Sequence, residues 1–141
     1  MKIQIINSAY FTNKPKLILE KKGNLSCLQV FEDGSKKEFF NSKLEKETMP
    51  DGSYKIYDGC GHLLCERFSN GFERGYDGTG RLTYETYPDG SSVSWHRTSG
   101  KICVKKNSDG SSQFYNGDGT LFIERDKTGK IIYQSENGFY E

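Results

Sequence analysis

A short segment with two cysteines and a histidine is the first candidate for chemistry in this sequence. The segment Cys60–Cys65 reads CGHLLC, and thiolate and imidazole groups are ligands that zinc prefers. A closed zinc site takes four ligands, usually as two close pairs, but the other cysteines and the second histidine are scattered along the chain. The strand register derived below also places His62 and Cys65 on opposite faces of a sheet. We therefore expect neither a metal nor another cofactor.

A repeated carboxylate is the second candidate. Glutamates occupy one column of an internal repeat, at Glu47, Glu66, Glu85 and Glu124. Paired carboxylates can act as general acid and base, but a catalytic pair should interrupt a repeating pattern once rather than follow it. A regular column indicates a structural role, in which the carboxylates pair across strands with Arg67, Arg74 and Arg81.

A histidine close to two serines is the third candidate. His96 lies near Ser94 and Ser99, which suggests a base and a nucleophile. The sequence contains no G-x-S-x-G motif and no evident acid to orient the histidine. We therefore expect His96 to be an exposed turn residue and the protein not to be an enzyme.

Aromatic and basic residues recur together and form the best candidate for a binding surface. The aromatic residues appear once per two expected strands, which spaces them by ~10 Å. Tyrosine, tryptophan and arginine dominate the energetics of many protein interfaces, so we expect this face to bind another protein. The residues are Tyr57, His62, Arg74, Tyr76, Arg81, Trp95, Lys101 and Tyr115.

Two other uses of this aromatic and basic face are open. Each tyrosine could pack on a cross-strand arginine and only stiffen the sheet. The rings could also stack on single-stranded nucleic acid or on sugars. A net charge of +1 disfavours nucleic acid, because binding to phosphates is driven by an excess of cations.

These columns are positioned by an internal repeat of about nineteen residues. A turn residue recurs at successive spacings of 19, 19, 19, 20 and 19, at Gly23, Ser42, Gly61, Gly80, Gly100 and Gly119. A second turn glycine recurs at Gly34, Gly52, Gly71, Gly90, Gly110 and Gly129. Such a unit holds two strands of roughly five to seven residues and is too short for a crossover helix. The extra residue before Gly100 predicts a longer turn or a bulge.

The repeat predicts an all-β fold, an antiparallel β-meander of roughly eleven to thirteen strands with little or no helix. If Gly78 and Thr79 are the centre of a turn, Tyr76 faces Arg81, and Gly75 faces Leu82. Leucines would then form a core face opposite the aromatic residues. A flat sheet of this width would leave that face wet, so we expect a strongly coiled sheet, barrel-like or folded into two layers.

The segment "YDGTGRLTYETYPDGSSVSW" resembles the YD repeat of Rhs and teneurin-type proteins. Tyr76-Asp77, Gly80-Arg81-Leu82, Pro88-Asp89-Gly90 and Trp95 match that repeat in order, and the resemblance covers about residues 31–133. It implies β-hairpins used as a structural shell, although about six units are too few to enclose a toxin. The rhythm is more distantly similar to MORN-type antitoxin-like repeats.

The 141 residues are expected to form a single domain. Residues 1–22 would supply N-terminal cap strands from the apolar runs Lys2–Ile6 and Lys16–Glu20, residues 23–133 the hairpin repeats, and residues 134–141 a C-terminal tail. The sequence has neither a secretory signal nor an apolar run that could span a membrane. We therefore expect a cytoplasmic protein with reduced thiols at Cys27, Cys60, Cys65 and Cys103.

These observations predict a binding protein that acts by steric occlusion. We expect a stoichiometric inhibitor, either an immunity protein or antitoxin that neutralises a toxin, or a phage-type inhibitor of a defence effector such as a CRISPR nuclease. Its partner would be another protein. One alternative is a small nucleic-acid or carbohydrate-binding protein, and another is a structural remnant of an Rhs-type shell. The sequence leaves the oligomeric state open.

Overall fold

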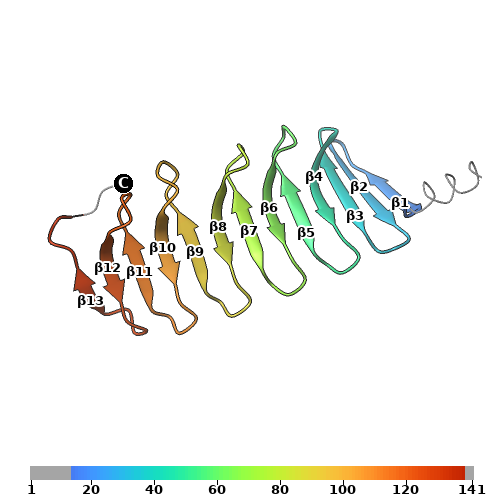
Figure 1. The fold of residues 1–141 in the computed structure, drawn as a ribbon. Helices are drawn as coiled ribbons and strands as arrows, with labels where there is room; N and C mark the ends of the chain where they lie inside the picture. The colour runs from blue at the N-terminus through green and yellow to red at the C-terminus, as the bar shows by residue number, and fades with distance from the viewer. Residues whose placement is uncertain (1–13, 139–141) are drawn as a thin grey trace, which may run out of the picture.

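The computed structural model describes residues 14–138, which form thirteen strands in one sheet (Figure 1). The strands follow sequence order, and each pairs in antiparallel fashion with its sequence neighbours. Every regular element of the described residues is a strand, so the predicted antiparallel meander is confirmed. The strands are β1 (Leu17–Lys22), β2 (Ser26–Phe31), β3 (Lys36–Phe40), β4 (Lys43–Thr48), β5 (Tyr54–Tyr57), β6 (Leu63–Arg67), β7 (Glu73–Tyr76), β8 (Leu82–Thr86), β9 (Ser92–Trp95), β10 (Ile102–Lys106), β11 (Ser112–Tyr115), β12 (Leu121–Arg125) and β13 (Ile131–Gln134).

Most of the hairpins are closed by the same short loop. In the β5–β6 hairpin, the amide of Asp58 donates to the carbonyl of His62 at 2.9 Å, and the amide of Gly61 donates back to Asp58 at 3.2 Å. Gly61 has a φ of 89°, a left-handed conformation that glycine adopts without steric cost. The β9–β10 loop is one residue longer, with the amide of Gly100 donating to His96, as the inserted residue predicts.

The sheet is open, and the expected closure into a barrel-like or two-layer form is wrong. Figure 1 shows β1 and β13 at opposite ends of one curved layer, and each described strand contacts only the strands next to it. No hydrophobic side chain of residues 14–138 is fully buried. Both faces carry charged cross-strand pairs, such as Arg74–Glu85 on one face and Arg67–Glu73 on the other. Closing the sheet would remove these charges from water, which costs free energy. The charged pairs also interrupt the apolar surface that would drive closure.

A bulge in every second strand from β4 to β12 changes the expected register. Gly75 pairs with Tyr84 and Arg74 pairs with Glu85, but Tyr76 pairs with Leu82 and not with Arg81. The unpaired residue is Thr83, whose hydroxyl donates to the carbonyl of Gly75 at 3.0 Å. The equivalent shifts occur at Leu44/Lys46, Leu63/Cys65, Ile102/Val104 and Leu121/Ile123.

The bulges also overturn the prediction that leucine and aromatic columns lie on opposite faces. Directly paired residues share a face of a sheet. Tyr57 pairs with Leu63, Tyr76 with Leu82, and Trp95 with Ile102, so the two columns lie together. We call this side the ladder face, since it also carries the charged column described below, and the other side the opposite face.

The opposite face contains one close approach between a ring and a glycine. Gly75 is the buried residue of β7, and the ring of Tyr84 lies directly on it, because a Cβ added at Gly75 would meet Tyr84 Cε1 at 1.9 Å. The hydroxyl of Tyr84 donates to Glu73 Oε1 at 2.7 Å and lies 3.8 Å from the sulfur of Cys65. Desolvation, together with the bond to Glu73, raises the pKa of Tyr84 well above its usual value. Glycine is therefore required here for space and not for a special backbone angle.

The predicted N-terminal cap is described only in part. The second apolar run, Lys16–Glu20, overlaps β1, whose six residues are all exposed. The first run, Lys2–Ile6, and the last residues of the predicted tail lie outside the described residues. Residues 14–138 contain no helix capable of crossing a lipid bilayer.

Candidate protein-binding face

A continuous column of paired residues crosses the ladder face and gives that face its name. Each member pairs directly with the member on the next strand, so the column passes through all thirteen strands. Its middle part alternates in charge, so each cross-strand pair there joins a cation and an anion, which is stabilising. The column is Glu20, Gln29, Lys37, Glu47, Lys55, Glu66, Arg74, Glu85, Val93, Lys105, Gln113, Glu124 and Tyr133.

The glutamates predicted to pair across strands lie in this charged column. Arg74 Nε lies 3.6 Å from Glu85 Oε1, as that prediction requires. Lys37, which was not among the predicted partners, has its Nζ 3.8 Å from Glu47 Oε2. Arg67 differs, because it pairs with Glu73 on the opposite face. Alternating cations and anions neutralise each other along the column, so this part of the face offers shape more than net charge.

Tyrosine hydroxyls anchor the aromatic column to the charged one. The hydroxyl of Tyr76 donates to Glu66 Oε1 at 2.8 Å, and burial together with this bond raises the pKa of Tyr76. Burial also raises the pKa of Tyr57, with a further contribution from Glu47. Tyr76 therefore bonds to a carboxylate one hairpin earlier rather than packing on Arg81, and the rings of Tyr57 and Tyr76 are both half-buried.

A second aromatic cluster lies at the other end of the same strands and was not predicted. The rings of Phe68 and Phe72 stack with centroids 5.6 Å apart, and Tyr87 lies 5.5 Å from Phe72. The guanidinium of Arg74 sits 5.0 Å from the centre of the Phe72 ring. Phe31, Met49, Phe68 and Tyr87 recur at near-regular spacing before the turn glycines, and this column was the signal in the sequence that could have revealed the cluster.

The predicted basic residues tie neighbouring hairpin tips together. The guanidinium Nη1 of Arg81 donates to the carbonyl of Arg97, and the ammonium of Lys101 donates to the carbonyl of Asp118 at 2.8 Å. Each bond reaches the tip of the following hairpin. A carbonyl satisfies a donor without cancelling its charge, so both exposed side chains remain cationic.

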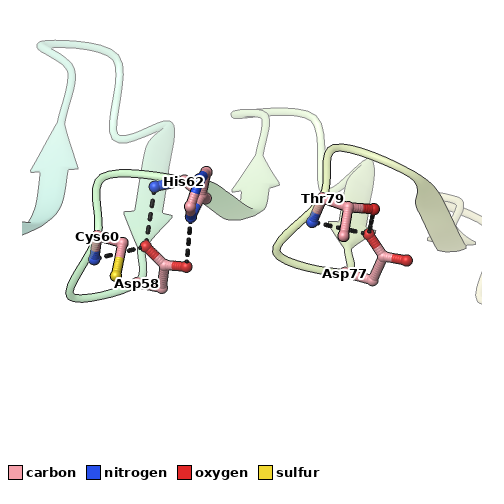
Figure 2. Close-up of polar contacts among 5 residues, drawn as sticks. All are labelled: Asp58, Cys60, His62, Asp77 and Thr79. Carbon is pink, nitrogen blue, oxygen red and sulfur yellow. Dashed lines mark hydrogen bonds and ion pairs between the residues drawn. The ribbon is translucent and has the colours of Figure 1, made fainter.

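The CGHLLC segment forms a turn and not a ligand cluster. The carboxylate of Asp58 accepts the amides of Cys60 at 2.8 Å and His62 at 2.9 Å, and its second oxygen lies 2.9 Å from His62 Nδ1 (Figure 2). Asp77 holds Thr79 in the same way. The bonds from His62 lower the pKa of Asp58. Residues 14–138, which include all four cysteines, contain no group of three side chains arranged for a metal, and those cysteines form no disulfide.

His96 is one of the most buried residues, so the expectation of an exposed turn histidine is wrong. Its side chain is 2% exposed, and its Nε2 donates to the carbonyl of Tyr115 at 2.8 Å. Asn116 occupies the equivalent position in the next hairpin and is also 2% exposed. The contact with Tyr115 comes from the following hairpin, nineteen residues away in the chain, so local turn signals could not predict it.

The predicted face residues therefore fall into three groups. Tyr57, Tyr76, Trp95 and Tyr115 share the ladder face with the leucine column, and Arg74 lies in the charged column beside them. Arg81 and Lys101 border the face at the hairpin tips, and His62 belongs to a turn.

Fold and surface together define an open, single-layer protein of β-hairpin repeats. No protein-family profile and no curated protein sequence matches the chain. Comparison with solved structures finds the TCP10 domain of Danio rerio CPAP in complex with a peptide of Danio rerio STIL, which is 20% identical over 83% of this chain and 98% of that chain. Its TM-score of 0.23 is too low to support a conclusion about fold or function. The similarity to YD-type repeats therefore stays a prediction.

Proposed function

We propose that this chain is a non-enzymatic protein-binding module whose ladder face docks another protein. The observation that carries the proposal is the joint position of the leucine and aromatic columns on one face of a sheet that no other described strand covers. Aromatic and aliphatic side chains that stay partly exposed gain free energy when a partner removes their remaining apolar area from water.

The scaffold is ordered before a partner binds, so docking has a small entropic cost. Asx-type bonds fix the hairpin tips, and cations from one tip reach the next. These bonds hold the ladder face in one shape before a partner binds. A preorganised surface avoids the entropic penalty of ordering loops on association. Occlusion of a partner's working surface is the simplest mechanism for such a module, so we propose a stoichiometric inhibitor of the immunity, antitoxin or anti-defence type.

Capture from the native host tests this function. The tagged chain and a Tyr76→Ala, Trp95→Ala variant are used to capture partners with and without nuclease, and Tyr54→Ala, which pairs with Arg67 on the opposite face, serves as the matched aromatic control. Circular dichroism checks that each variant keeps its sheet. We expect one protein in a fixed stoichiometry, retained by the control and lost by the double variant. Steeply salt-dependent binding to oligonucleotides with no protein partner would overturn the proposal in favour of a nucleic-acid binder.

A further inference from the structure

A hollow on the ladder face is lined by an aliphatic side chain, an aromatic ring and a cation. It has a volume of about 610 Å³ and is lined by Lys43, Leu44 and Tyr57 together with the turn residues Gly59, Cys60 and Gly61. Leu44 and Tyr57 are half-buried, whereas Lys43 is exposed at the rim. An apolar side chain placed here would contact leucine and tyrosine at once.

A second hollow repeats this construction two units later. It has a volume of about 470 Å³ and is lined by Arg81, Leu82 and Trp95 together with the turn residues Thr98, Ser99 and Gly100. The cation, the leucine and the aromatic residue each stand 38 positions after their counterparts in the first hollow (81 − 43, 82 − 44 and 95 − 57). The two hollows are therefore equivalent positions of the repeat.

The charges that line the two hollows have one sign. Each hollow is lined by a single charged side chain, Lys43 or Arg81, and neither lining includes a carboxylate. The hydrogen bond from Arg81 to the carbonyl of Arg97 fixes the guanidinium at the rim and leaves its charge in place. An incoming carboxylate next to an apolar side chain would match both features of each hollow.

The spacing of the hollows sets the length of the segment that can fill both. Leu44 lies on β4 and Leu82 on β8, which are four strand steps apart in the sheet. At ~4.8 Å per step the hollows are separated by ~19 Å, and an extended chain that rises ~3.3 Å per residue covers this distance in about six residues.

We propose that the ladder face binds an extended, acidic protein segment that crosses the strands and inserts two large apolar side chains, about six residues apart, into these hollows. Each apolar residue has a carboxylate beside it, one for Lys43 and one for Arg81. The inference rests on the proposed protein-binding function and adds the chemistry of the partner. It specifies binding across the face and not addition of a strand to the edge of the sheet.

The shape of the hollows favours a peptide over a nucleic acid. Stacking of bases needs flat, accessible aromatic faces and a track of cations along the backbone. Here each hollow has one lining cation and not a track of them, and the net charge of the chain is +1.

Defined synthetic peptides test the inference on the full chain. The probe is a fluorescein-labelled 12-residue peptide with two phenylalanines six residues apart, a glutamate beside each, and serine and glycine elsewhere. Fluorescence polarisation compares it with a peptide whose phenylalanines are two residues apart and with one that has lysine in place of glutamate. We expect both altered peptides to bind about tenfold more weakly, because each loses one anchor or both ion pairs.

Variants of the protein locate the binding. A Lys43→Glu, Arg81→Glu double variant should reverse the preference and favour the lysine peptide, whereas Lys127→Glu at a distant turn should leave affinities unchanged. Charge reversal at exposed positions keeps the sheet intact, as circular dichroism will verify. Equal binding of the three peptides, an unchanged preference in the double variant, or tighter binding of a single-stranded oligonucleotide would each overturn the inference. A captured host protein that tolerates this double variant would overturn the inference while leaving the protein-binding function standing.

Discussion

Replacement of Gly75 by alanine offers the sharpest test of how the sheet is stabilised without a core. The added Cβ would lie 1.9 Å from Cε1 and 2.4 Å from Cδ1 of Tyr84, so the ring must leave its position on the backbone. The displaced ring loses the 2.7 Å bond to Glu73, worth roughly 1.5 kcal/mol for a charged acceptor. It also loses contact area worth roughly 1.5 kcal/mol.

Two opposing effects set the net magnitude. Alanine in a strand gains about 0.5–1 kcal/mol over glycine, because it loses less backbone freedom on folding. We therefore expect Gly75→Ala to lower the free energy of unfolding by about 2 kcal/mol. In a Tyr84→Ala background the same change should raise it by about 0.5–1 kcal/mol, since no ring is displaced.

Equilibrium urea unfolding of the four proteins, followed by circular dichroism and by tryptophan fluorescence, measures this coupling. Gly59→Ala is the matched control, because a Cβ there meets nothing within 4 Å and the backbone angle is ordinary. Its effect should stay within about 0.5 kcal/mol. An equal loss from Gly75→Ala in both backgrounds would refute the reasoning, because it would show that backbone strain and not the ring decides the cost.

Three further predictions concern the hairpin tips and the ladder face. Hydrogen bonds from Ser, Thr and backbone groups lower the pKa of four turn aspartates below the ordinary value of about 3.9, namely Asp51, Asp77, Asp89 and Asp109. The folded state therefore binds fewer protons than the unfolded state, so the urea midpoint should be highest above about pH 5 and should fall as the pH drops through these pKa values. The fall should be smaller in Asp77→Asn. Tyr76→Phe removes the bond to Glu66 and should cost about 1 kcal/mol in urea unfolding, while Tyr133→Phe on the exposed terminal strand should cost nothing measurable, and equal effects would argue against anchoring by Glu66. His96→Ala empties a buried position and removes the bond to the Tyr115 carbonyl, so it should cost about 2 kcal/mol. His62→Ala at an exposed turn should cost much less, and the same assay decides.

The period of the sequence was enough to predict the strands and their order, because turn residues and alternating side chains are local signals. The register was predicted only in part. Arg74 and Glu85 pair as expected, but Thr83 is an extra residue that no local signal announces, and it moves Leu82 to the side of Tyr76. Closure was predicted wrongly, because it requires one purely apolar face, which the bulges and the charged pairs remove.

The candidate face shows the same division. The aromatic column could be identified from its regular spacing, and the structure places its four members on one side. The hydrogen-bond acceptors of Arg81 and Lys101 could not be identified from the sequence. Both are backbone carbonyls, which every residue type carries. Burial of His96 involves a bond to Tyr115 in the next hairpin, which is a tertiary effect.

The restriction of each strand to its two neighbours has a consequence for how the molecule comes apart. Thermal opening must start at the ends, where β1 and β13 have a paired strand on one side only, and advance one hairpin at a time. Amide hydrogens of β7 and β8 should then exchange most slowly and those of the outer hairpins fastest, in a graded profile along the chain. Tyr76 and Leu82 lie on these two central strands, so this part of the ladder face would keep its shape while both ends of the sheet fray.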